Sequence, residues 1–132
     1  MREQLEISNY LYVLMMILMF VCGTAVGQDF INDDFNERIA KDVVAVEFWA
    51  DWNKHNQFAE LNSLKECESY RLDIMAKADI QAKYNITAIP TVVIFDNGVE
   101  KCRFNANIMF QLEADKKVIQ NSVDTIILNK FQ

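Results

Sequence analysis

The sequence predicts an α/β domain in which helices flank a central mixed β-sheet. The run from Val43 to Trp49 is mainly apolar on both of its alternating faces, as is typical of a strand that helices cover on both sides of a sheet. Asn97-Gly98 separates two further strand-like runs. Asn-Gly in such a place is the strongest short-range signal of a β-hairpin, because both residues tolerate positive φ.

The other elements follow from the spacing of apolar residues. Polar residues before Phe35 indicate the start of a short helix, and apolar residues three and four apart after Asn53 predict a longer one. Apolar and polar residues alternate from Leu72 to Ile80, which predicts a second strand. In chain order we expect a helix over 33–41, a strand over 43–49, a helix over 53–69, a strand over 72–80, hairpin strands over 91–95 and 99–104, and a helix over 112–128. The last helix should bury a face formed by Val118, Ser122, Val123, Ile126 and Ile127.

Residues 1–27 are set apart from this domain. Tyr10 to Val21 is almost wholly apolar, and small residues in an Ala25-x-Gly27 pattern follow it. A membrane span needs ~20 apolar residues, so this shorter run is more typical of a signal peptide. We therefore predict a cleaved signal peptide over 1–27 and one domain over 28–132. The alternatives are an uncleaved membrane anchor, or an extra N-terminal element packed on the domain.

Composition narrows the class of partner. The chain has 132 residues, enough for one domain, and its three Gly and one Pro leave no flexible linker. Its net charge of −6 argues against binding to nucleic acid or to anionic membrane surfaces. A protein or peptide is the expected partner, and a homo-oligomer is the alternative. Contact with a membrane is expected only if residues 10–21 form an uncleaved anchor.

Three short motifs are similar to those of the thioredoxin family. They are Phe-Trp-Ala-Asp-Trp over 48–52, Tyr-Asn-Ile-Thr-Ala-Ile-Pro-Thr over 84–91, and Phe-Asp-Asn-Gly over 95–98. The resemblance extends from about Asp29 to the end of the chain, and the expected order of elements is also that of the family. It implies a thioredoxin fold, with the first motif at the entrance to the active-site loop.

The loop after Trp52 departs from the family pattern. The family carries Cys-x-x-Cys there, whereas this chain has Asn53-Lys54-His55-Asn56. An asparagine supplies no thiolate, so dithiol exchange at this loop is excluded and no catalytic residue is expected. Asn53 instead suits the N-cap of the following helix, where its side-chain oxygen would accept a hydrogen bond from the first turn.

The resemblance also implies a buried ion pair beneath the loop. Glu47 matches an acid on the central strand of the family, and Lys77 matches a lysine on the neighbouring strand. A buried carboxylate without a partner is costly, so we expect each residue to neutralise the other. With no thiol above it, Glu47 is interpreted as a structural remnant. The alternative is a functional acid.

The only proline marks the expected binding surface. The family has a cis proline at the position of Pro90, and its loop presents backbone groups of the preceding residue to an extended partner chain. The sequence predicts an apolar surface beside the loop that is suited to peptide contact, although the Trp side chains have the alternative of simply covering the sheet end. The expected binding residues are Trp49, Trp52, Lys54, His55, Ile89, Pro90 and Thr91.

The remaining reactive side chains give no second site. Cys67, expected late on the helix, and Cys102, expected on an edge strand, are predicted to lie too far apart for a disulfide. His55 should be exposed, and one imidazole alone is a poor metal site, so neither metal nor cofactor is expected. Asn85 opens an N-glycosylation sequon that matters only in a protein secreted by a eukaryote, and we interpret this short pattern as a chance occurrence, with a glycan as the alternative.

These patterns predict a redox-inactive, thioredoxin-like protein of the secretory route that acts as a binding or chaperone-type module. The expected location is outside the cell or in the endoplasmic reticulum lumen, and membrane anchoring is the alternative. Two other functions stay open. One is atypical monothiol chemistry at Cys67 or Cys102, and the other is a structural role as a subunit of an oligomer.

Overall fold

The computed structural model describes residues 34–132. The predicted signal peptide or anchor over 1–27 lies outside the described residues. Within 34–132, none of the helices combines the length and the apolar character that crossing a membrane requires.

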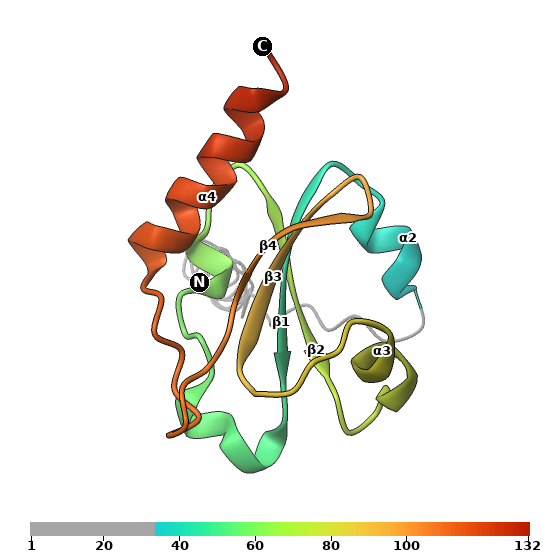
Figure 1. The fold of residues 1–132 in the computed structure, drawn as a ribbon, viewed down its shortest axis with the longest axis vertical. Helices are drawn as coiled ribbons and strands as arrows, with labels where there is room; N and C mark the ends of the chain where they lie inside the picture. The colour runs from blue at the N-terminus through green and yellow to red at the C-terminus, as the bar shows by residue number, and fades with distance from the viewer. Residues whose placement is uncertain (1–33) are drawn as a thin grey trace, which may run out of the picture.

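A mixed sheet of four strands in the order β2-β1-β3-β4 forms the centre of the domain (Figure 1). The strands are β1 (Val43–Trp49), β2 (Glu68–Asp73), β3 (Thr91–Asp96) and β4 (Val99–Phe104). β1 pairs with β2 in parallel and with β3 antiparallel, and β3 pairs with β4 antiparallel. The predicted fold class, the first strand and the hairpin are confirmed. Asn97 and Gly98 form the turn with φ of 49° and 83°, as their tolerance of positive φ allows.

Helices cover both faces of the sheet. The short helices α2 (Phe35–Ile39) and α3 (Ala78–Lys83) lie on one face, and the longer α4 (Lys116–Asn129) lies on the other (Figure 1). Alternate residues of β1 therefore enter different cores, since successive side chains of a strand point to opposite faces. Phe48 packs in the cluster beneath α2 and α3, whereas Ala45 packs in the cluster beneath α4.

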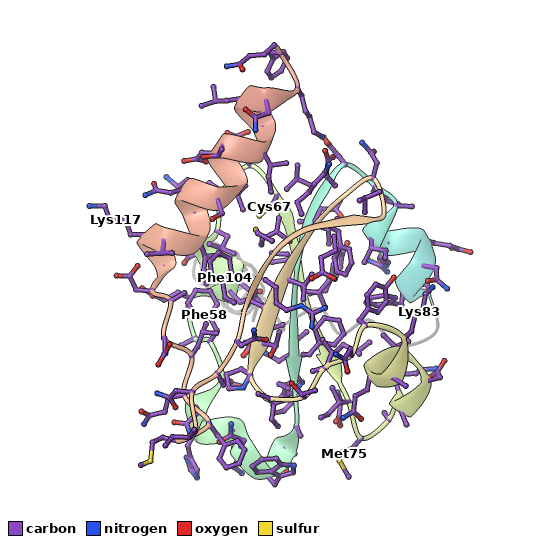
Figure 2. All side chains as sticks on the ribbon, in the orientation of Figure 1. Phe58, Cys67, Met75, Lys83, Phe104 and Lys117 are labelled. Carbon is purple, nitrogen blue, oxygen red and sulfur yellow. The ribbon has the colours of Figure 1, made fainter. Side chains whose placement is uncertain are left out.

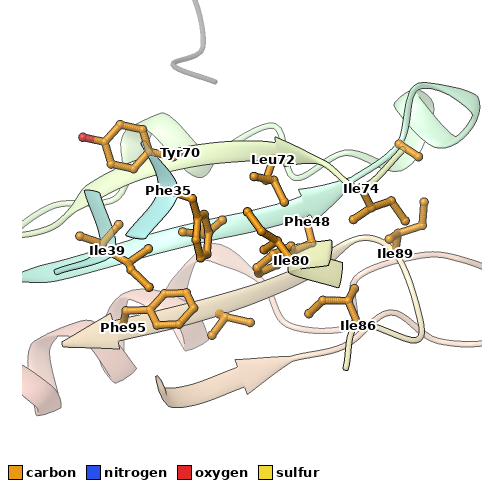
Figure 3. Packing of buried hydrophobic residues seen from close by; sticks show 14 residues of the cluster. Phe35, Ile39, Phe48, Tyr70, Leu72, Ile74, Ile80, Ile86, Ile89 and Phe95 are labelled. Atoms are coloured by element: carbon orange, nitrogen blue, oxygen red, sulfur yellow. The ribbon is translucent and has the colours of Figure 1, made fainter. Parts of the chain in front are cut away.

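The core on the α2 and α3 side is rich in aromatic rings (Figure 3). The Phe35 ring centroid lies 6.0 Å from that of Phe95 and 5.5 Å from that of Tyr84, both with tilted or edge-on rings. Edge-to-face contacts of this kind add to the free energy gained by burying the rings. This core anchors the N-terminal helix α2, which the sequence predicted from the cap residues before Phe35.

The core on the α4 side is smaller and aliphatic. α4 buries Ile119 and Val123, and Figure 2 places Phe58 and Phe104 between α4 and the sheet, with Lys117 pointing away. The predicted start of this helix is wrong by four residues. Asp115 is the N-cap and accepts a hydrogen bond from the Val118 backbone N–H, so Val118 lies in the first, exposed turn instead of the buried face.

The predicted helix over 53–69 is not formed. Two short 3-10 helices stand in its place, η1 (Asp51–Asn56) and η2 (Leu61–Ser63), and β2 begins at Glu68. The backbone of Phe58 accounts for the difference. Its N–H donates to Glu47 at 2.6 Å and so cannot make the backbone bond of a helix, and its C=O accepts from Arg71 at 3.0 Å and from the Leu61 N–H at 3.2 Å, which is the spacing of a 3-10 turn.

The predicted strand over 72–80 is also wrong. β2 ends at Asp73, whose side chain accepts a hydrogen bond from the Met75 N–H at 2.9 Å and closes a turn. Met75 is left exposed, and Ile80 reaches the core from helix α3 instead of from a strand. The alternating apolar residues of this stretch therefore belong to three different elements, a strand, a turn and a helix.

Candidate functional site

Three segments meet at the carboxyl end of β1. They are η1, the residues around Ile89 and Pro90 that lead into β3, and the loop over 107–111. In Figure 1 the green η1 and the orange segment before α4 lie together at the end of the molecule opposite the C terminus. The side chain of Asn53 joins all three by hydrogen bonds.

Asn53 is held by its amide group. The Asn53 Nδ2 donates to the Ile89 carbonyl oxygen at 3.2 Å and to the Phe110 carbonyl oxygen at 3.1 Å. Its Oδ1 accepts from the Asn56 Nδ2 at 2.9 Å. The expected N-cap role is wrong, because η1 already begins at Asp51 with Ala50 as its N-cap. Asn53 lies inside η1 at a kink, with φ −113° and ψ 25°, and its side chain bridges to other segments.

The expected apolar surface is only partly present. The Ile89–Pro90 peptide bond is cis. The structure buries the side chains of Ile89, Pro90 and Thr91, and the Thr91 hydroxyl donates to the Ala88 carbonyl oxygen at 2.7 Å. These three residues are therefore placed beneath the surface, because β3 enters the centre of the sheet at this point and helices cover both of its faces.

The two tryptophans lie differently. Trp49 is half-buried, and the guanidinium carbon of Arg71 lies 5.8 Å from its ring centroid, within reach of a cation–π contact. Trp52 is 58% exposed. Lys54 and His55 are also exposed, as expected for His55. No group of three or more metal-ligating side chains occurs within residues 34–132.

A loop that the sequence analysis missed completes the exposed surface. Trp52 packs edge-on against Phe110, with ring centroids 5.3 Å apart and planes at 87°. The neighbouring Ile108 and Met109 are 95% and 66% exposed, and Phe110 is 46% exposed. We refer to Trp52, Ile108, Met109 and Phe110 together as the Trp52 surface. Three consecutive large apolar residues outside any helix or strand period were the available signal.

The loop that carries these side chains is ordered by Asn107. Its Oδ1 accepts from the N–H groups of Met109 at 2.8 Å and Gln111 at 3.1 Å. Its backbone N–H donates to the Gln111 carbonyl oxygen, and its carbonyl oxygen accepts from the Phe110 N–H at 3.0 Å. Phe110 has φ of 57°, a conformation that is unfavourable for a bulky side chain. The loop thus exposes apolar side chains from a backbone that is held in place.

Beneath η1, Glu47 is fully buried and forms an ion pair with Arg71 rather than with Lys77. The Arg71 Nε lies 2.7 Å from the Glu47 Oε2, and the two residues stand opposite each other in the pairing of β1 with β2. Lys77 was the wrong partner because β2 ends at Asp73, which leaves Lys77 in the turn before α3. Burial raises the pKa of Glu47, and the Phe58 N–H and the Arg71 charge oppose that rise.

The two cysteines of the described chain are free thiols on different elements. Cys67 directly precedes β2 instead of lying on a helix, and Cys102 lies on the edge strand β4 as predicted. Burial raises the pKa of Cys67 to about 11, and the negative charges of Asp124 and Glu66 add to the rise. Burial also raises the pKa of Cys102. Both surroundings disfavour a thiolate near neutral pH.

Comparisons with known proteins agree on the family. The thioredoxin family profile matches residues 28–121. The chain is 37% identical to a thioredoxin of Mycoplasma genitalium over 70 residues, which are 48% of this chain and 69% of that protein. It is 33% identical to a thioredoxin of Mycoplasma pneumoniae over 66 residues, which are 46% of this chain and 65% of that protein.

Solved structures share the fold. A mutant thioredoxin of Halobacterium salinarum matches with a TM-score of 0.58 at 16% identity, covering 74% of this chain and 87% of its own. A mutant thioredoxin of Entamoeba histolytica matches with a TM-score of 0.57 at 22% identity, covering 75% of this chain and 99% of its own. These structures show the fold, and the family profile over residues 28–121 together with the 37% identical relative establishes that the chain belongs to the thioredoxin family.

Proposed function

We propose that this chain is a redox-inactive member of its family that binds apolar segments of a protein or peptide through the Trp52 surface. The observation that carries the proposal is the composition of the loop after β1. The positions where the family carries its two cysteines hold the amides of Asn53 and Asn56, which bond to each other at 2.9 Å. Dithiol exchange needs two adjacent thiols, one to attack and one to resolve, and an amide does neither.

The exposed apolar side chains support binding as the remaining use. Large apolar side chains that gather on a surface are typical of an interaction site. Here they project from η1 and from a loop whose backbone is held by hydrogen bonds to Asn107, so little ordering is left for a partner to impose. The relatives are named simply as thioredoxins, and a binding module would be a departure from them in this chain.

Insulin reduction with dithiothreitol tests the redox part of the proposal. We expect the wild-type protein to add no turnover to the dithiothreitol background. The Asn53→Cys, Asn56→Cys double variant is the matched positive control, because the two amides are in contact and two thiols there are close enough to act together. Turnover by the wild type would contradict the proposal, and its loss in a Cys67→Ser, Cys102→Ser variant would assign it to monothiol chemistry.

Suppression of aggregation of a reduced, unfolded client protein tests the binding part. We expect the wild type to suppress aggregation and the Trp52→Ser and Ile108→Ser variants to lose this effect. Val99→Ser is the matched control, because Val99 is an equally exposed apolar residue on β4 outside the Trp52 surface. Equal loss in the control would contradict a specific role for the Trp52 surface.

The proposal places the protein on the secretory route, with residues 1–27 as a cleaved signal peptide. The apolar run before Ala25 supports this placement. Mass spectrometry of the protein purified from its own cells identifies the mature N terminus, and a chain that retains residues 1–27 would favour the anchored alternative. Size-exclusion chromatography of the mature chain separates a monomeric binder from a subunit whose Trp52 surface is covered in an oligomer.

A further inference from the structure

The amide of Asn53 uses both of its donors and its acceptor oxygen. Both neighbours of its Nδ2 are backbone carbonyl oxygens, and these only accept hydrogen bonds, so the amide nitrogen must face them. A side-chain amide carries two N–H donors, and one is available for each carbonyl. The Oδ1 is in turn used by Asn56. The position therefore suits an amide specifically, since a carboxylate of the same shape has no hydrogen to donate.

The two carbonyl groups belong to segments that are distant from η1 in sequence; the pairing of β1 with β3, in which Phe48 lies opposite Thr91, brings the first of them beside η1. Ile89 lies 36 residues and Phe110 lies 57 residues away in the chain. Among the hydrogen bonds of the described residues, those of the Asn53 side chain are the ones that tie η1 to both segments. The ring contact between Trp52 and Phe110 joins the same two segments, because Trp52 is the residue before Asn53.

Phe110 is the residue that most needs such support. Its φ of 57° is unfavourable for a bulky side chain and persists only where the surroundings hold it. Its N–H is held by the Asn107 carbonyl oxygen and its carbonyl oxygen by Asn53. Without the bond from Asn53 the peptide unit after Phe110 keeps the hydrogen bond from the Gln111 N–H to Asn107 Oδ1 at 3.1 Å but loses its link to η1, so we expect the Phe110 ring to move away from the edge of Trp52.

We propose that Asn53 is a positioning residue that holds the Trp52 surface in its binding conformation. This inference rests on the proposed function, since it concerns the same surface. The amide fixes the 107–111 loop against η1, so that Trp52 and Phe110 form one contact area before any partner arrives. A partner with apolar side chains then binds without first having to order the loop. Asn53 thus has a use in this chain that depends on its being an amide and not a thiol.

Three variants test the role of Asn53. Asn53→Asp keeps the shape and removes both donors, and Asn53→Ala removes the whole side-chain amide. Asn56→Ala is the matched control, because it removes only the donor to Oδ1 and leaves the two carbonyl bonds of Asn53 in place. Urea unfolding of each variant identifies the temperature and pH at which all are fully folded, and the measurements are made there.

Hydrogen exchange of the loop amides in the free protein tests directly whether the Asn53 side chain holds the 107–111 loop. We expect the N–H groups of Met109, Phe110 and Gln111 to exchange roughly tenfold faster in Asn53→Asp and Asn53→Ala, with amides of β1 unchanged. We expect Asn56→Ala to exchange like the wild type. Unchanged protection of the loop in Asn53→Asp would overturn the inference whether or not the protein binds anything.

Binding to reduced, carboxymethylated α-lactalbumin, a permanently unfolded chain, provides the second readout. We expect the affinity to fall about fivefold in both Asn53 variants, because the side chains of Trp52 and Phe110 must then be ordered on binding. We expect the affinity to stay unchanged in Asn56→Ala. Loss of loop protection without loss of affinity would overturn the positioning role. If the wild type does not bind this probe, the proposed function fails, and the exchange data still decide whether Asn53 holds the loop.

Discussion

Polar side chains hold the segment that follows β1 at two places, and they do so by different chemistry. At Phe58 the backbone N–H and C=O are bound by Glu47 and Arg71, a fully buried pair of charges. At the other end of the segment, Asn53 binds two carbonyl groups with a neutral amide close to the surface. The first arrangement takes the Phe58 N–H out of the helix that the sequence predicts, and the second ties η1 to the segments at Ile89 and Phe110.

The difference separates stability from surface shape. When a buried charge loses its partner, the other charge is left in a medium that solvates it poorly, so the whole fold depends on the pair. When a carbonyl group near the surface loses its donor, water replaces it at a small cost. We therefore expect changes at Arg71 to unfold the protein and changes at Asn53 to alter mainly the Trp52 surface.

The largest effect is expected from Arg71→Met. It leaves the Glu47 carboxylate buried without its partner and removes one of the two donors to the Phe58 carbonyl, which should lower the free energy of unfolding by about 3–5 kcal/mol. Urea denaturation followed by tryptophan fluorescence measures this change. The Glu47→Gln, Arg71→Met double variant keeps an acceptor for the Phe58 N–H without a charge, and it should recover part of the loss. If Arg71→Met lowered the free energy of unfolding by less than Asn53→Asp does, the distinction between the buried ion pair and the amide would fail.

The same pair has a pH dependence with a definite sign. Burial raises the pKa of Glu47 from its ordinary value of 4.5, so the native state binds this proton more tightly than the unfolded chain does. The contribution of Glu47 to the free energy of unfolding is fully present below pH 4.5, and it is lost as the pH rises through the native pKa. Loss of the Arg71 charge raises the native pKa further, so Arg71→Met should be less destabilising relative to wild type at pH 5 than at pH 8. If Arg71→Met lowered the free energy of unfolding equally at pH 5 and pH 8, the result would argue against a raised pKa of Glu47.

A smaller loss of stability is expected from Asn53→Asp. Two hydrogen bonds to backbone carbonyl groups are removed at a partly exposed site, which should cost about 1–2 kcal/mol. Urea denaturation again provides the measurement, with Asn56→Ala as the control of equal location. If Asn53→Asp unfolded the protein as Arg71→Met does, the amide would belong to the stability of the fold and the distinction between the two regions would fail.

Trp52→Ala should have a still smaller effect on stability. Trp52 is largely exposed, and its loss removes mainly the ring contact with Phe110, worth about 0.5–1.5 kcal/mol. Thermal unfolding measures the cost, and client-protein binding by the same variant should be lost. A large loss of stability with intact binding would reverse the roles that we assign to the two regions.

The last prediction concerns the thiols, which lie outside both regions and should react slowly at neutral pH. With a pKa of about 11, Cys67 should be alkylated by iodoacetamide at a rate that rises about tenfold per pH unit until near pH 11. Peptide mapping by mass spectrometry separates Cys67 from the other cysteines. A rate that levels off at or below pH 9, the ordinary thiol value, would revive the monothiol alternative.

Local signals in the sequence accounted for the elements whose structure is local. The alternating apolar faces of Val43–Trp49 and the Asn97-Gly98 turn were predicted from neighbouring residues alone, and both occur as predicted. Between 53 and 69 the apolar spacing was interpreted wrongly as one helix, since a spacing of three also suits short 3-10 turns. Phe58, Leu61 and Leu64, which carry that spacing, all reach the core from these turns and the segments beside them.

The sequence by itself determined the fold and the absence of thiols from the loop after Trp52, because motifs, periodicity and residue identity carry that information locally. The tertiary structure decided the partner of Glu47, the role of Asn53 and the composition of the Trp52 surface. These depend on contacts across 24, 36 and 57 residues of chain. Such contacts form only when strands and loops distant in sequence are brought side by side, and local spacing contains no record of which residues will then meet.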